Sequence, residues 1–467
     1  MSGQDENRAF EWVESLMDGK IVEKKPQIRW RQHWYLKVRQ ADGGIVDVLL
    51  RGHRIPGGHV SPDEAHAKAM LKTDAETLEY LQGLPIRTPR YYGFNEDLGW
   101  MLMENVPGEA EITGVSDPEL RARIYREYLH DIAVIHSQPL DVARVPTNVH
   151  VPRNSADMVD RYMADTKRRF DEEKRNVPEP IFRLGYQWLL DNPIGDRPLK
   201  LCLCDVGPNQ FIFKDGAYVA PFDFECALVC DPLLDIAMMR MREMTYSIGG
   251  TTDHVLYYGS VYEELTGQKL DIDALHYWTM FGEVCFGLWF NKGAQFPLPK
   301  ELDSVFILAW EVQQRRSIVE ALADKYRIEL DELDIPAPVS NVMTTAFDLM
   351  KGQFREFYSH KFEEWNSALY TDYASALADS LGRSNEFGNA FHGANVEELS
   401  DLISRKVDDW RSGLAILEDL IAQDYEKDFE ERLKFLHRSA LRQEYLYEPM
   451  QRATGVSPRT PLSRLYS

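Results

Sequence analysis

Within residues 199–242, two aspartates and one residue with an amide side chain are of the types that phosphoryl transfer requires. Two apolar runs each carry an aspartate at a strand end, Asp205 and Asp223, and a tight Asp-Gly turn at 214–216 joins the runs. In such a hairpin one aspartate orients and deprotonates an acceptor hydroxyl, while an amide and a second aspartate hold Mg²⁺ against the phosphates of ATP. Asp205, Gln210 and Asp223 have this order and spacing. The segment therefore predicts an active-site hairpin for phosphoryl transfer.

The same segment resembles the aminoglycoside phosphotransferase and choline kinase superfamily. Its pattern reads His-Gly-Asp-x₄-Asn, then Ile-Asp-Trp/Phe-Glu, then Gly-Asp-Pro-x-x-Asp-Leu-Ala, and the matching segments here are 203–210, 222–225 and 230–237. The resemblance implies that Asp205 is the catalytic base and that Gln210 and Asp223 bind the metal. It also implies that Asp231 braces the catalytic loop and that Asp235 helps to start the next helix.

Residues 1–108 have the pattern of a smaller, β-rich, nucleotide-binding lobe. We expect a helix over 8–17, strands over 34–38 and 45–50 around an Asp-Gly-Gly turn, a helix over 62–81 and a strand over 100–104. This order is that of a kinase N-lobe. Residues 102–108 match the family's Leu-Met-Glu-x-x-Pro-Gly hinge, which implies that Met103, Glu104 and Val106 contact the nucleotide.

A cation and an acid in this lobe stand at family positions with altered residue types. Arg51 takes the place of the phosphate-binding lysine, although the two cations are not interchangeable. Asp74 aligns with the helix glutamate that pairs with that cation, and Glu76 is the alternative. The turn over the phosphates, residues 29–33, has no glycine, so its backbone amides approach phosphates less freely. Its candidates for side-chain charge are Arg29, Arg31 and His33.

The catalytic loop also departs from the family pattern. Leu203 and Cys204 replace the family's His and Gly, and Gln210 replaces its Asn. Asn209 is an alternative metal ligand, although strand alternation would point it the other way. These departures leave open a second hypothesis, a catalytically weak or inactive kinase-like protein that binds a nucleotide or metabolite.

The remaining chain is predicted to be helical. Residues 109–330 would form the C-lobe around the hairpin, with His136 in a core helix over 127–137, a charged helix over 158–177 and aromatic helices within 262–310. After a linker at 336–338, residues 340–467 would form a helical extension. Asn395 with Glu398 suggests a helix start, followed by an apolar stripe over 396–421. The stripe fits either an intramolecular helix hairpin or the seam of a homodimer.

Composition limits the classes of partner. The chain has 467 residues, 44% hydrophobic, and a net charge of −22, which argues against nucleic acid. No apolar run is long enough for a membrane span, and no secretory signal is visible, so we expect a cytoplasmic protein. A zinc site from Cys202, Cys204, Cys226 and Cys230 is the metal alternative. Because Cys202 and Cys204 alternate with leucines, small buried hydrophobes are favoured.

These patterns together predict an α+β protein with a bilobal protein-kinase-like fold and a helical C-terminal extension. The implied cofactors are ATP, with GTP not distinguished from it, and Mg²⁺. The implied partner is a small-molecule hydroxyl acceptor, and the resemblance leaves open aminoglycosides, choline-like amines, sugars and hydroxyacyl thioesters.

Overall fold

A computed structural model describes residues 3–28, 31–53, 64–171, 178–246, 254–287, 304–354 and 365–466. Parts of four predicted segments lie outside these residues: 29–30 of the phosphate-covering turn, 62–63 and 172–177 of two helices, and 288–303 of the aromatic region. The chain divides into two compact units. The first comprises residues 1–158, 196–242 and 256–271, and the second comprises 159–195, 243–255 and 272–467.

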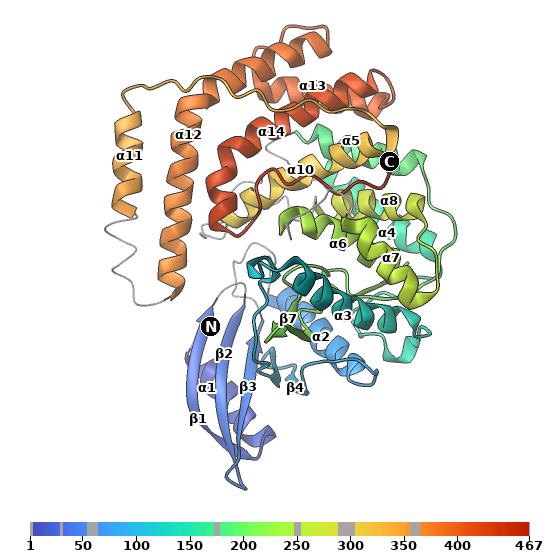
Figure 1. Cartoon of the computed structure of the whole chain (residues 1–467), viewed down its shortest axis with the longest axis vertical. Coiled ribbons are helices and arrows are strands. Elements are labelled where there is room, and N and C mark those ends of the chain that lie inside the picture. The colour runs from blue at the N-terminus through green and yellow to red at the C-terminus, as the bar shows by residue number, and fades with distance from the viewer. Residues whose placement is uncertain are drawn as a thin grey trace. The chain divides into compact units, whose positions relative to one another are not determined.

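The first unit contains a five-stranded antiparallel sheet in the order β1-β2-β3-β5-β4 (Figure 1). Its strands are β1 (Gly19–Ile28), β2 (Gln32–Gln40), β3 (Ile45–Gly52), β4 (Tyr91–Asn95) and β5 (Trp100–Glu104). Helix α1 (Gly3–Leu16) packs on the sheet through Phe10 and Val13 against Leu36, Val48 and Trp100. The predicted strands and hairpin are confirmed, and β1 and β4 are two further strands that the sequence pattern did not indicate.

Two helices of this unit lie beside the sheet and the hairpin. Helix α2 (Glu64–Leu81) buries Leu71, Ala75 and Leu78 together with Asp74. After the short helix η1 (Ile112–Gly114), helix α3 (Pro118–Ser137) begins earlier than the predicted residue 127. Asp117 caps it by accepting a hydrogen bond of 3.0 Å from the amide of Glu119. A proline at the first helical position suits this start, because its missing amide proton is not needed there.

The predicted hairpin is formed by β7 (Phe211–Lys214) and β8 (Ala217–Pro221). Asp215 and Gly216 in its turn both have positive φ, 51° and 76°, as a two-residue turn of this kind requires. A second pair, β6 (Lys200–Cys202) with β9 (Leu228–Cys230), encloses the hairpin in sequence. Helix α6 (Leu233–Thr245) and helix α7 (His254–Thr266) follow.

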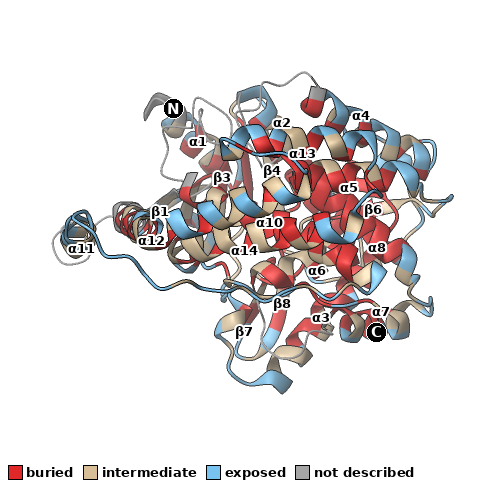
Figure 2. Cartoon of the chain, turned by 90° about the horizontal axis from the view of Figure 1, so that it is seen from above, coloured by how far each residue is buried: buried red, intermediate tan, exposed pale blue. Residues whose placement is uncertain are grey.

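The second unit is helical where the structure describes it. Its elements are α4 (Ser155–Asp171), which begins in the first unit, α5 (Pro180–Asp191), α8 (Ile272–Phe281), the π-helical turn η3 (Gly282–Phe286), α10 (Ser304–Tyr326), α11 (Thr344–Gly352), α12 (Trp365–Leu402), α13 (Trp410–Gln423) and α14 (Phe429–Ala453). Helix α11 buries none of its residues, and Figure 2 shows its exposed surface. No described helix is both long and apolar enough to cross a lipid bilayer.

The structure corrects one prediction for the C-terminal region. Asn395 does not start a helix, because it lies well inside α12, which ends at Leu402. The apolar stripe is therefore divided between α12 and α13, and Asp409 caps the second helix. Leu399, Leu417 and Ile421 are fully buried within the chain itself. Their burial favours the intramolecular alternative for these stripe residues, and a homodimer stays a prediction.

Candidate active site

Arg51 contacts two other predicted site residues that are far apart in the sequence. Strand β3 positions it, and its two terminal nitrogens contact two carboxylates: Nη1 lies 2.9 Å from Oδ2 of Asp74, and Nη2 lies 2.6 Å from Oδ1 of Asp223. Asp74 also accepts a hydrogen bond of 3.0 Å from the amide of Phe224, next to Asp223. The sheet, α2 and the end of the hairpin therefore meet at one guanidinium group.

The electrostatics of this cluster follow from its burial. Burial disfavours the charge of Arg51, but the carboxylates of Asp74 and Asp223 outweigh that effect and raise its pKa. Burial raises the pKa of Asp74, and the Arg51 cation opposes that rise. Glu76, the alternative partner, lies elsewhere: it accepts from the amide of Thr147 at 2.6 Å. Of the two acids proposed from the sequence, Asp74 is the one that contacts Arg51.

Asp205, the predicted base, is held by two donors. Gln210 donates through Nε2 to Oδ2 of Asp205, and Arg242 contacts the other oxygen, Oδ1. When the Gln210 amide donates through its nitrogen, its carbonyl oxygen remains available as a metal ligand. The structure therefore brings Gln210 to Asp205, whereas Asp223 contacts Arg51. Arg242 was not predicted as a site residue, and no motif in the sequence marks it.

The loop around Asp205 is anchored to neighbouring helices. Gly207 has a φ of 121°, and its amide donates to the hydroxyl of Tyr128 at 3.2 Å. Burial raises the pKa of Tyr128, so this hydroxyl keeps its proton. Two non-glycine residues of the loop, Cys204 and Asn209, also have positive φ, 65° and 66°. Such backbone conformations persist only where surrounding contacts hold them.

The roles expected for Asp231 and Asp235 are reversed. Asp235, fully buried, braces the loop by accepting from the amides of Leu203 at 2.9 Å and Cys204 at 2.8 Å. Asp231 instead accepts from the amide of Leu233 at 3.0 Å, at the first residue of α6, and pairs with a guanidinium of the same unit. The sequence pattern identified both as structural but could not show which backbone amides each one reaches.

His136 is a buried core residue, as expected, and it also supports this brace. Its Nε2 lies 3.0 Å from Oδ2 of Asp235, and its Nδ1 lies 2.8 Å from the hydroxyl of Tyr262. His136, Cys202 and Asp235 form the one possible metal-binding group among the described residues. Burial raises the pKa of Cys202 well above its ordinary value, so the thiol stays protonated and donates to backbone carbonyls. A thiol in that state is a poor metal ligand.

The predicted zinc alternative lacks support in the described parts of the chain. None of the four cysteines named for it forms a disulfide, and Cys202, Cys204 and Cys230 are buried. Burial of Cys202 and Cys204 agrees with the leucine alternation around them.

The phosphate-covering turn and the hinge supply the remaining predicted residues. Arg31 is buried and forms an ion pair with Glu225, two residues after Asp223. Met103 is buried in β5, and Glu104 accepts from the amide of Arg90 at 3.0 Å. Val106, half-buried, follows in the linker after β5.

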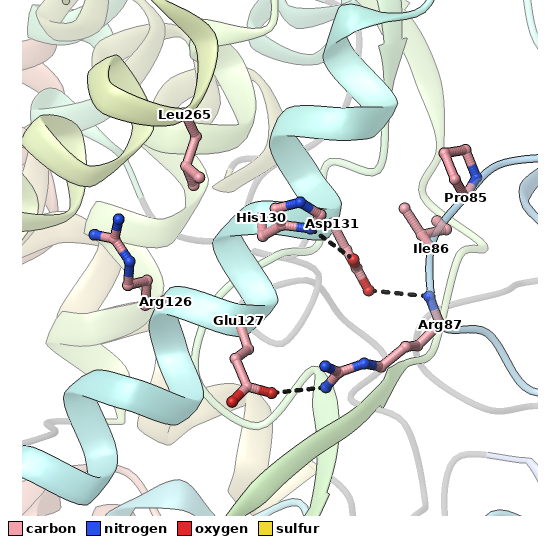
Figure 3. Close-up of a pocket in the computed structure, with 8 residues that line it drawn as sticks. All are labelled: Pro85, Ile86, Arg87, Arg126, Glu127, His130, Asp131 and Leu265. Atoms are coloured by element: carbon pink, nitrogen blue, oxygen red, sulfur yellow. Dashed lines mark hydrogen bonds and ion pairs between the residues drawn. The ribbon is translucent and has the colours of Figure 1, made fainter.

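A cavity of about 560 Å³ lies on another part of the first unit (Figure 3). Arg87 lines it and donates through Nη1 to Glu127 at 2.7 Å and to the carbonyl of Tyr218 at 2.6 Å. Asp131 accepts from the amide of Arg87 at 3.2 Å. None of the predicted site residues lines this cavity.

Comparisons with known proteins place the chain in a family. Residues 30–266 match the model of the Phosphotransferase enzyme family, so the chain belongs to that family. The α+β, protein-kinase-like fold with a helical C-terminal region is thereby confirmed. No curated protein matches the sequence.

Solved structures resemble the chain at low identity. Macrolide 2′-phosphotransferase MphH from Brachybacterium faecium is 16% identical, with coverage of 66% of this chain and 98% of its own and a TM-score of 0.42. A choline/ethanolamine kinase family protein from Mesorhizobium loti is 12% identical, with coverage of 68% and 95% and a TM-score of 0.44. An aminoglycoside phosphotransferase in complex with ADP and hygromycin B is 14% identical, with coverage of 67% and 97% and a TM-score of 0.45.

Proposed function

We propose that the protein is an ATP- and Mg²⁺-dependent phosphotransferase that transfers a phosphoryl group to a hydroxyl of a small-molecule acceptor. The observation that carries the proposal is the ion-pair cluster in which Arg51 contacts Asp74 and Asp223 at once. Kinase-like enzymes use such a cation to hold nucleotide phosphates next to the metal-binding aspartate. Family membership supports the same reaction class.

The side chains present suit Mg²⁺. This ion prefers one or two carboxylates with further oxygen ligands, and it supplies charge that neutralises phosphate oxygens when bound. Asp223, whose side chain is 27% exposed, offers the carboxylate. Gln210 offers an amide oxygen. Asn209 is the alternative, because its Oδ1 is buried without a hydrogen-bond partner within the described ranges.

Asp205 has the role of aligning the acceptor hydroxyl and accepting its proton as the new bond forms. Its side chain is 30% exposed, which leaves room for an acceptor to approach. Arg51 would hold the nucleotide phosphates by exchanging its present carboxylate contacts for phosphate oxygens, a geometry that guanidinium groups favour.

A second candidate is a nucleotide- or metabolite-binding protein with little or no transfer activity. One observation favours it: the phosphate turn has no glycine, and the buried Arg31 of that turn pairs with Glu225. This ion pair places the protein's own carboxylate against a cation that would otherwise be available to phosphate.

The decisive experiment compares the full-length chain with its Asp205→Asn variant. Melting temperatures are measured with ATP, with and without Mg²⁺, and phosphate transfer is measured against a metabolite library. We expect metal-dependent stabilisation by ATP in both proteins. Transfer should fall by roughly 10²–10⁴-fold in the variant, the usual range for a general base. Asp215→Asn, in the exposed turn of the same hairpin, is the matched control and should retain full activity.

Each result selects one candidate. Equal transfer by wild type and Asp205→Asn would remove Asp205 from the reaction. ATP binding that ignores Mg²⁺, without transfer or ATP hydrolysis by wild type, would establish the binding-protein alternative.

A further inference from the structure

We propose that Arg242 is a positioning residue for phosphoryl transfer, which fixes the carboxylate of Asp205 and the loop that carries it. The inference rests on the function proposed above and deepens it, since the family pattern quoted from the sequence includes no residue at this position. Arg242 lies in α6, 37 positions after Asp205 in the sequence.

The guanidinium of Arg242 contacts the loop at two points. Nη1 contacts Oδ1 of Asp205, and Nε donates to the carbonyl of Pro208 at 2.6 Å. The guanidinium is planar and its N–H directions are fixed, so two simultaneous contacts set the position of one acceptor relative to the other. The side chain is only 12% exposed, which limits its freedom to move away.

The aliphatic stem of Arg242 lies directly beneath the loop. A Cβ atom at Gly207 would be 3.3 Å from Cβ and Cδ of Arg242 and 3.3 Å from Cα of Met239. Positions 205 and 208 therefore contact this side chain through polar atoms, and its stem borders the space that a side chain at position 207 would need. This is more contact than a lone surface ion pair has, and it fits a role in holding the loop in shape.

The loop needs such support because of its own sequence. Cys204 and Asn209 adopt positive φ, a backbone conformation that is unfavourable for most non-glycine residues and is here strained above all at Cys204. Asp235 holds the amides of Leu203 and Cys204, and Tyr128 holds that of Gly207, but these contacts fix the backbone. The contacts of Arg242 and Gln210 act on the carboxylate itself. Arg242 therefore links the carboxylate to the backbone frame.

Two substitutions separate geometry from charge. Arg242→Lys keeps a cation and most of the stem that packs under Gly207, but an ammonium is a point charge and cannot reproduce the fixed fork. Arg242→Ala removes both. If two-point positioning matters, kcat should fall by about 10²-fold in Arg242→Ala, and Arg242→Lys should recover little of it. KM for ATP should stay within a factor of two, because Arg242 contacts the base and not the Arg51 cluster.

The experiment measures kcat and KM for ATP, melting temperature and hydrogen exchange of the 205–210 amides in the full chain. Arg123→Ala is the matched control, because Arg123 is an exposed arginine that donates to the carbonyl of Gly216 at 3.1 Å, at the far end of the hairpin. The proposal is supported if Arg242→Lys has the wild-type melting temperature but a reduced kcat and faster hydrogen exchange of the 205–210 amides. Added free guanidinium should restore part of the activity of Arg242→Ala.

Other outcomes would overturn the inference, and they distinguish its failure from a failure of the proposed function. An active wild type with unchanged kcat in Arg242→Ala refutes the positioning role while the transferase proposal stands. A wild-type kcat in Arg242→Lys would show that the positive charge alone matters. A rise in KM for ATP at constant kcat would show that Arg242 contributes to substrate binding and not to positioning of the base. If wild type transfers phosphate to nothing, the proposed function fails, and unchanged hydrogen exchange in Arg242→Ala then also refutes the bracing of the loop.

Discussion

Arg51 on β3 and Asp223 beyond β8 form an ion pair of 2.6 Å although 172 positions separate them in the sequence. The pair is partly buried, and Asp74 on α2 completes it. Removing one partner from a buried ion pair leaves a charge that neither water nor protein compensates. The cluster therefore fixes the hairpin to the sheet, and a bound metal would compete with Arg51 for the Asp223 carboxylate.

Asp223→Asn is expected to abolish the part of ATP binding that depends on Mg²⁺. Asp223 has a φ of 69°, and asparagine adopts this backbone conformation readily, whereas alanine would be strained there. The test is the melting-temperature shift caused by ATP with and without Mg²⁺. Asp215→Asn, with a φ of 51° in the exposed turn, is the control for charge removal at positive φ. A wild-type response to Mg²⁺-ATP in Asp223→Asn would refute the metal assignment.

Much of the site could be predicted because its chemistry lies in short, local patterns. The Asp-Gly turn and the apolar runs fix the hairpin, and the alternation in β2 and β3 fixes the strand that carries Arg51. The family resemblance implies that Asp74, or else Glu76, pairs with Arg51, and the structure has the ion pair of 2.9 Å with Asp74.

The features that were missed depend on distant contacts. Strand β1 is rich in Lys and Glu and includes Pro26, which edge strands tolerate, so its sequence has little apolar signal. Asn395 has a capping pattern, but the helix continues past it because Phe391 and Leu399 on either side are buried. Arg242 reaches Asp205 only because α6 passes under the loop, and no spacing rule reports that proximity.

Gly207→Ala should destabilise the protein and reduce transfer. Alanine is strained at a φ of 121°, and its Cβ would meet Met239 Cα at 3.3 Å, where backbone cannot easily give way. We expect a loss of about 1–3 kcal/mol in unfolding free energy, measured by denaturant titration. Gly114→Ala is the control, because a Cβ there would meet nothing within 4 Å. Equal stability of the two variants would show that the loop is not packed against α6 as described.

Leu417→Ala should weaken the fold and leave the oligomeric state unchanged. Leu417 is fully buried in α13, so truncation removes apolar burial and leaves a cavity that costs about 2–5 kcal/mol. Leu381→Ala is the matched control, because Leu381 is 46% exposed and should lose far less. Unfolding free energy and size-exclusion elution over a range of concentrations provide the measurements. A concentration-dependent shift in elution that Leu417→Ala abolishes would instead support the dimer seam.

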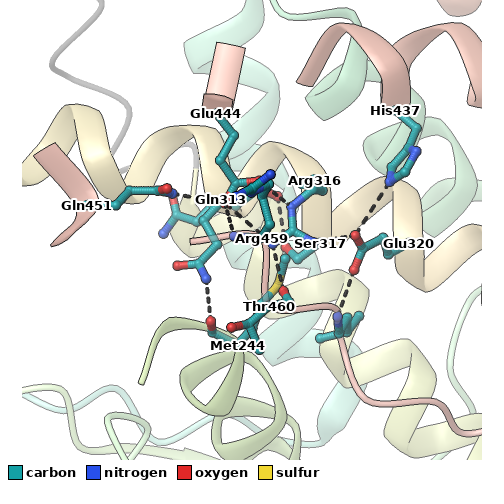
Figure 4. Close-up of polar contacts among 12 residues, drawn as sticks. Met244, Gln313, Arg316, Ser317, Glu320, His437, Glu444, Gln451, Arg459 and Thr460 are labelled. Carbon is teal, nitrogen blue, oxygen red and sulfur yellow. Dashed lines mark hydrogen bonds and ion pairs between the residues drawn. The ribbon is translucent and has the colours of Figure 1, made fainter. Parts of the chain in front are cut away.

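A buried ionic network in the second unit gives a prediction for pH dependence (Figure 4). Arg316 pairs with Glu320 and with Glu444, whose Oε2 lies 2.7 Å from its Nε. Oε2 of Glu320 accepts from the amide of Leu462 at 2.7 Å, and its Oε1 lies 3.5 Å from Nε2 of His437. The network holds the C-terminal segment against α10 and α14.

Glu320→Gln should cost stability at neutral pH and make the protein less sensitive to acid. Burial tends to raise the pKa of Glu320, but Arg316 and the hydrogen bonds from His437 and Leu462 outweigh it and lower that pKa below 4.5. A carboxyl whose folded pKa is depressed contributes stability above its unfolded pKa, and this contribution disappears as the pH falls through the folded pKa. The difference in unfolding free energy between wild type and variant should therefore be full above pH 4.5, at about 1–3 kcal/mol, and should shrink below it. Denaturant titrations across that range measure it, with exposed Glu397→Gln as the control that shows little difference at any pH. A gap between wild type and Glu320→Gln that stays constant into acid would mean that the ionised carboxylate is not what stabilises the network.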